Sequence, residues 1–199
     1  MWALTTRRIQ QEKIQTVILT SNVVSDYNGG KYLIATLKDI EGHAISGAKI
    51  SVNLNGVKQL TTDSNGQIKL STNNLVPNSY VATINYLGNN NYLNSTATAK
   101  ITINKATPKL IASKKTFKRA DKTKKYTVTL KTNQNKALSN VKVKIKINKK
   151  TYTSKTNSKG IATFKLTKKK KKGKYNSVVA FEGNQCYKKI TRNVKITIK

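Results

Sequence analysis

The 199-residue sequence contains 39 lysines and arginines but only seven acidic residues, which gives a formal net charge of +32. No run of about 20 apolar residues is present, so we expect no transmembrane helix. The single cysteine, Cys186, excludes an intrachain disulfide. The length fits two domains of about 100 residues each.

The first 15 residues form a separate N-terminal segment, which we predict to be a short helix or disordered. Residues 5–15 contain the one plausible helix of the sequence. The segment has no apolar core of the length that a signal peptide needs. If the protein works outside the cell, we therefore expect this chain to be a fragment of a longer secreted precursor, and a wrongly assigned start codon is the alternative.

Residues 16–104 and 105–199 are predicted to be two copies of one domain, because short motifs recur in the same order at an offset of 93 to 95 residues. The matched segments are residues 31–32 with 125–126, 44–50 with 137–143, 62–66 with 156–160, and 100–103 with 195–198. A period of this length is too long for a solenoid repeat and matches one immunoglobulin-type sandwich.

Strict alternation of apolar and polar residues predicts the strands of both copies. The clearest examples are residues 50–54 and 101–103 in the first copy and residues 125–131, 141–147 and 194–198 in the second. Turn signals such as Asn55-Gly56 and Lys159-Gly160 separate them. We therefore predict an all-β protein of two tandem immunoglobulin-like β-sandwich domains, with about seven strands each.

The motifs of both copies resemble the bacterial-type immunoglobulin-like repeats of large surface proteins. Each copy has a Lys-Tyr strand ending in Thr-Leu-Lys, an Ala-[Ile/Leu]-Ser-[Gly/Asn] turn, a Thr-[Asp/Asn]-Ser-x-Gly turn and a closing Lys-Ile-Thr-Ile. The likeness covers residues 16–199 and is greatest to the adhesin-like proteins of methanogenic archaea. It implies a non-enzymatic, extracellular module of the cell surface or cell wall, monomeric or part of a longer repeat chain. A host glycan or surface protein is a further partner that it implies.

The sequence predicts no catalytic site, metal site or cofactor. His43 is the one histidine and lies in a predicted turn without a paired nucleophile. Residues 63–66 resemble a calcium loop, but Lys159 stands in the second copy where an oxygen ligand would be needed. A β-turn explains both copies better. Cys186 aligns with a turn residue of the first copy, so we expect a half-buried thiol without a catalytic role.

The positive charge is concentrated in the second copy. Residues 105–199 carry 30 basic and two acidic residues, a net charge of +28, whereas residues 1–104 carry a net charge of +4. A lysine-rich loop and lysine-rich strand faces contribute to this charge. We predict that the following lysines dock on an anionic cell-wall or envelope polymer: Lys142, Lys144, Lys146, Lys168, Lys169, Lys170, Lys171, Lys172, Lys174 and Lys195. The alternatives are a role in solubility alone or a general lysine bias.

Nucleic acid is the rival partner for a surface this basic. The chain has only four arginines, the residue that most often reads bases, and no zinc finger, helix-turn-helix or RNA-binding motif. We therefore expect no specific nucleic-acid partner and keep nonspecific nucleic-acid binding as the alternative function.

Asn94 begins an Asn-Ser-Thr sequence, which fits the acceptor for N-glycosylation. It lies in a predicted loop or at the start of the last strand of the first copy. We expect its use only if the chain is secreted.

Overall fold

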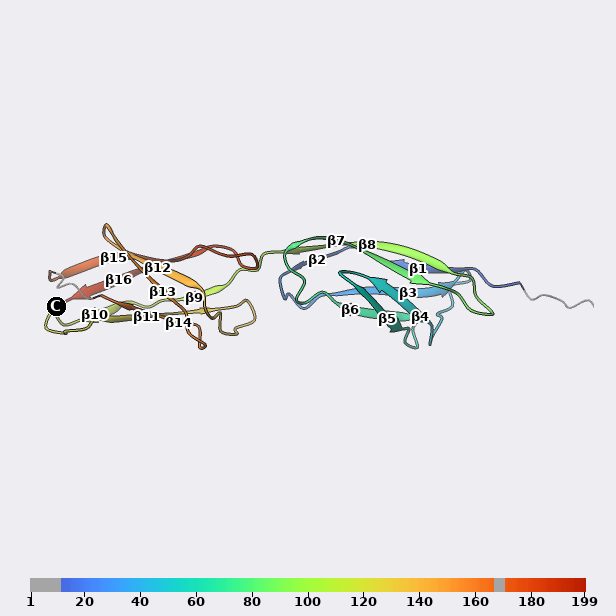
Figure 1. The fold of residues 1–199 in the computed structure, drawn as a ribbon, viewed down its shortest axis with the longest axis horizontal. Helices are drawn as coiled ribbons and strands as arrows, with labels where there is room; N and C mark the ends of the chain where they lie inside the picture. Colours follow the sequence, from blue (N-terminus) through green and yellow to red (C-terminus); the bar gives the residue numbers. More distant parts are fainter. Residues whose placement is uncertain (1–11, 167–170) are drawn as a thin grey trace, which may run out of the picture. The chain divides into compact units, whose positions relative to one another are not determined.

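The computed structural model describes residues 12–166 and 171–199. These residues form strands and no helix, so none of them belongs to a helix that could cross a membrane (Figure 1). The chain divides into two compact units, made chiefly of Gly30–Asn73 and Asn78–Thr102 in the first and of Ile103–Lys199 in the second. We refer to them as the first and the second domain.

The first domain consists of a three-stranded and a five-stranded sheet. The three-stranded sheet has the order β1 (Thr16–Thr20), β3 (Tyr32–Asp39), β6 (Gln67–Ser71). The five-stranded sheet has the order β2 (Val23–Asp26), β8 (Ser95–Asn104), β7 (Asn78–Tyr86), β4 (Lys49–Asn53), β5 (Val57–Thr61).

The second domain repeats this topology. Its three-stranded sheet has the order β14 (Ile161–Lys165), β11 (Lys125–Lys131), β9 (Lys109–Ile111). Its five-stranded sheet has the order β10 (Lys115–Phe117), β16 (Ile190–Ile198), β15 (Gly173–Phe181), β12 (Lys142–Ile147), β13 (Lys150–Lys155). The prediction of an all-β chain with two tandem immunoglobulin-like sandwiches is confirmed.

Each domain has eight strands in its described part rather than about seven, because its first strand is divided between the two sheets. In the first domain, β1 pairs with β3 in the small sheet, and the chain then crosses to place β2 beside β8 in the large one. In the second domain, β9 pairs with β11, and β10 then runs parallel to β16. Dividing an edge strand shortens the exposed edge of each sheet, which hinders pairing with other chains.

The core of each domain lies between its two sheets and follows from the alternation in the sequence. Val143, Ile145 and Ile147 of β12 are fully buried, while the residues between them face solvent. Ile50 and Val52 of β4 are buried in the same way in the first domain. Burying each such side chain stabilises the fold by about 1.5–3 kcal/mol, so a shift of one residue in register would be strongly unfavourable.

A buried threonine fixes the same loop in both domains. The hydroxyl groups of Thr62 and Thr156 donate to the main-chain carbonyls of Ile45 and Leu138, both at 2.7 Å. Each hydroxyl also accepts a main-chain N–H, at 2.8 Å in the first domain and 3.1 Å in the second. The repeated sequence motif therefore corresponds to a repeated hydrogen-bond arrangement.

The N-terminal segment is described only in part. Residues 1–11, which include most of the segment predicted to be a short helix or disordered, lie outside the described residues. Residues 12–15 contain a β-bridge from Ile14 to Tyr92 and no helix.

Candidate polyanion-binding surface

Lysines occupy every outward position of β12. Lys142, Lys144 and Lys146 are exposed and alternate with the buried core residues of this strand. Alternate residues of a strand lie about 7 Å apart on the same face. The strand therefore presents a row of three ammonium groups on the outer face of the five-stranded sheet.

The neighbouring strand β13 adds a fourth lysine to this row. Lys155 lies directly opposite Lys142, and both side chains are exposed. The register is set by the two-residue turn between the strands, in which Asn148 has a φ of 53°. Lys155 is not among the lysines predicted from the sequence, although a two-residue turn starting at Asn148 would have given this pairing.

Two more of the predicted lysines lie on the same face of the sheet. Lys195 of β16 is exposed opposite Asn176, and Lys174 of β15 is exposed opposite Thr197. We call the set Lys142, Lys144, Lys146, Lys155, Lys174 and Lys195 the lysine face.

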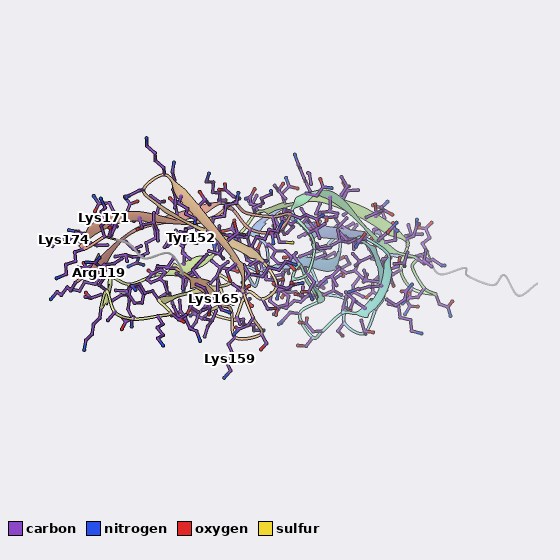
Figure 2. The ribbon with its side chains drawn as sticks, turned by 60° about the vertical axis from the view of Figure 1, so that its left-hand side comes forward. Arg119, Tyr152, Lys159, Lys165, Lys171 and Lys174 are labelled. Carbon is purple, nitrogen blue, oxygen red and sulfur yellow. The ribbon has the colours of Figure 1, made fainter. Side chains whose placement is uncertain are left out.

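The lysine-rich loop between β14 and β15 is described in part. Lys171 and Lys172 are exposed, whereas Lys168, Lys169 and Lys170 lie outside the described residues. Figure 2 shows Lys171 and Lys174 pointing outward at the end of the second domain. The structure thus supplies exposed ammonium groups from this loop next to the start of β15.

No residue of the lysine face forms an ion pair among the described residues. In the described part of the second domain, the one ion pair joins Lys189 Nζ to Glu182 Oε2 at 2.9 Å. The hydrogen bond and charge of Lys189 lower the pKa of Glu182, and Lys144 contributes further to this shift. Glu182 is therefore ionised at neutral pH, but a single carboxylate cannot neutralise the lysines around it.

Like charges also face each other on the other sheet of the second domain. Lys125 pairs directly with Lys165, and Lys131 pairs directly with Lys109. Directly opposed like charges destabilise a sheet. The second domain therefore carries a charge distribution that its own fold does not favour.

The corresponding sheet of the first domain shows that the fold does not need these lysines. Ser51 and Asn53 of β4 occupy the positions of Lys144 and Lys146, and they pair with Gln59 and Val57 of β5. Asn85 of β7 faces the same way, since it pairs with Ser51. The same topology thus forms with fewer lysines on this face, where Lys49 keeps the position of Lys142 and pairs with Thr61.

Lys124 is basic but has a different role. It is only 4% exposed, and its ammonium group donates to the main-chain carbonyls of Asp121 at 2.7 Å and Arg119 at 3.1 Å. It therefore holds the loop before β11 and does not contribute to the exposed surface.

Two other residues singled out from the sequence, Asn94 and Cys186, lie in loops. Asn94 is exposed immediately before β8, so its amide is accessible. Cys186 is half-buried as predicted, and its main-chain N–H donates to Asn184 Oδ1 at 3.0 Å. Its counterpart Asn91 donates to Asn89 in the same way at 2.8 Å, so the thiol is not required for this turn.

The chain is similar in fold to known tandem immunoglobulin-like structures. A crystal structure of consecutive titin domains shares 7% identity and a TM-score of 0.56, covering 93% of this chain and 66% of that one. Invasin, a bacterial integrin-binding protein, shares 16% identity and a TM-score of 0.53, covering 92% of this chain but 39% of its own length. A bacterial ice-binding adhesin has a TM-score of 0.39 at 12% identity, with 94% of this chain and 66% of that one covered. No family model and no curated protein matches the chain.

Proposed function

We propose that this chain is a non-enzymatic, adhesin-like module of the cell surface, whose second domain docks on an anionic cell-wall or envelope polymer. The first domain serves as a spacer or presents a ligand site, and a host glycan or surface protein is the partner class that it suits. The module works as a monomer or as part of a longer repeat chain outside the cell, where Asn94 is available for glycosylation.

The observation that carries this proposal is the charge contrast between two sandwiches of the same topology. On the five-stranded sheet, the first domain has Ser51, Asn53 and Thr61 where the second has Lys144, Lys146 and Lys155. The opposed lysine pairs of the second domain oppose folding, so selection for stability does not explain them. An external polyanion would relieve this repulsion.

The physical basis of the binding is nonspecific electrostatics. Lysine ammonium groups are compact point charges on flexible stems, which suit an irregular carboxylate or phosphate polymer better than a defined planar group. Docking would release counterions from the polymer, so the affinity should fall steeply as the salt concentration rises.

The test replaces three residues of the lysine face by their first-domain counterparts. The triple variant Lys144→Ser, Lys146→Asn, Lys155→Thr is compared with a control that removes three first-domain lysines, Lys31→Ser, Lys58→Ser, Lys69→Ser. Both variants lose the same net charge. Binding to polyglutamate, to polyphosphate and to isolated cell envelopes is measured between 50 and 300 mM salt.

We expect the lysine-face variant to bind more weakly. For polyphosphate, the slope of log binding constant against log salt concentration should be shallower by about two to three. The control should retain most of the affinity. Equal losses in the two variants would show that net charge, and not the lysine face, governs binding.

Nonspecific nucleic-acid binding is tested in the same assay with single-stranded DNA of matched charge. The alternative predicts tight, length-dependent DNA binding at physiological salt and weak binding to envelopes. That result would replace the cell-surface function with a nucleic-acid function.

A further inference from the structure

The loop between β3 and β4 brings the only histidine of the chain into contact with two carboxylates. His43 Nδ1 lies 3.1 Å from Asp39 Oδ2 and 3.5 Å from Glu41 Oε2. One donor atom of each residue lies within 4.8 Å of the donor atoms of the other two. The Asp39 side chain is 8% exposed, whereas His43 and Glu41 are 72% and 75% exposed.

These separations match those of ligands around one transition-metal ion. Zn²⁺ binds imidazole nitrogen and carboxylate oxygen at about 2.0–2.2 Å, so tetrahedral ligands lie about 3.4 Å from one another. Both distances from His43 Nδ1 are close to that value. A small closure of the exposed Glu41 and His43 side chains would complete the three-ligand arrangement.

The charge around the loop also points to a cation. The chain has seven acidic residues against 39 lysines and arginines. Two of the seven converge here, yet neither forms an ion pair with a lysine or arginine among the described residues. Both carboxylates face the imidazole of His43 instead.

The second domain shows that formation of the loop does not require these residues. Its equivalent loop contains Thr132, where the Thr132 N–H donates to Lys136 O at 2.8 Å and the Lys136 N–H donates to Thr132 Oγ1 at 3.2 Å. The first domain has the same two bonds between Asp39 and His43, at 3.0 and 2.9 Å. A threonine hydroxyl is sufficient for this turn, so the second carboxylate oxygen and the imidazole are additional features.

We propose that Asp39, Glu41 and His43 form a binding site for one divalent transition-metal ion of the Zn²⁺ class. A nitrogen donor with two carboxylates suits Zn²⁺ and its neighbours in the first transition row, whereas Ca²⁺ requires six to eight oxygen ligands. Three protein ligands leave at least one coordination position open to water or to an external carboxylate or phosphate. The ion also ties the end of β3 to the turn that follows it.

The test is titration of the full chain with zinc chloride by isothermal calorimetry, in a Cys186→Ser background that removes the thiol as a competing ligand. We expect one ion per chain, and protein NMR should show the His43 ring resonances shifting together with the Asp39 and Glu41 signals. His43→Gln, at an exposed position, should fold normally and bind at least about a hundredfold more weakly.

The second domain provides a gain-of-function variant. Thr132→Asp, Gln134→Glu, Lys136→His transfers the ligand set onto a loop with the same main-chain hydrogen bonds. The stoichiometry should rise from one to two, with a weaker second site because of the surrounding positive charge. The proposal is overturned if the unmodified loop binds no zinc, or if His43→Gln binds as tightly as the parent chain.

Discussion

Replacement of Thr156 by valine tests whether the buried threonine holds the second sandwich together. Valine has nearly the same shape as threonine, so the substitution removes the hydroxyl without opening a cavity. Thr156 is 4% exposed, and its hydroxyl donates to Leu138 O at 2.7 Å and accepts the Val141 N–H at 3.1 Å. Both main-chain groups would lose their partner.

The expected cost follows from these two contacts. A polar group left without a partner in a buried site costs about 1–3 kcal/mol, so the two together should lower the free energy of unfolding by about 2–6 kcal/mol. Each 1.4 kcal/mol corresponds to about a factor of ten in the population of the open state. Hydrogen exchange in the core of the second domain should therefore accelerate at least about thirtyfold.

Hydrogen exchange followed by mass spectrometry on the intact chain can separate the two domains. Peptides from β12 should lose protection in Thr156→Val, while peptides from β4 should not change. Thr62→Val should give the opposite pattern, and Thr153→Val, at an exposed position of β13, should stay within about 0.5 kcal/mol of the parent chain. The reasoning fails if Thr156→Val behaves like Thr153→Val.

Three further predictions concern individual side chains. Gly66→Ala should destabilise the first domain by about 1–3 kcal/mol in denaturant unfolding, because Gly66 has a φ of +71° and an added methyl group would lie 2.5 Å from the Leu37 carbonyl oxygen. Lys124→Met should speed trypsin cleavage of the loop at residues 118–123, since that loop loses two charge-assisted hydrogen bonds; unchanged cleavage would contradict this role. The pKa of Asp39 is lowered on folding, so its stabilisation is present above its ordinary value of 3.8 and is lost as the pH falls through the folded-state value. Unfolding measured at pH 5 and pH 3 should show a smaller acid loss in Asp39→Asn than in the parent chain.

The sandwich fold was predictable because one physical rule sets both the sequence pattern and the burial. Each strand has one face in the core and one in water, so Val143, Ile145 and Ile147 alternate with lysines and are the residues that the structure buries. The turns were predictable for a similar local reason. Asp63 Oδ1 accepts the main-chain N–H groups of Asn65 and Gln67, both at 2.9 Å, so the calcium-like motif is a self-capped turn.

Residues that are brought together by pairing between strands were harder to predict. Lys155 lies beside Lys142 only because the turn at Asn148 contains two residues, and Lys125 faces Lys165 only because β11 pairs with β14. Alternation assigns each lysine to a face, but it does not say which lysine lies opposite. The outward position of Lys142, Lys144 and Lys146 followed from the alternation, whereas the arrangement of lysines in opposed pairs required the register.

The His43 cluster shows why a turn can conceal a site that periodicity does not indicate. Asp39, Glu41 and His43 alternate in sequence as they would on one face of a strand, but β3 ends at Asp39 and the chain reverses. The main-chain hydrogen bond from Asp39 to His43 folds the imidazole back over the carboxylate that closes the strand. In an extended strand, Asp39 and His43 would lie about 13 Å apart, beyond the reach of one metal ion. The turn therefore creates the constellation, and the same turn without acidic residues in the second domain provides the comparison that separates ligand binding from folding.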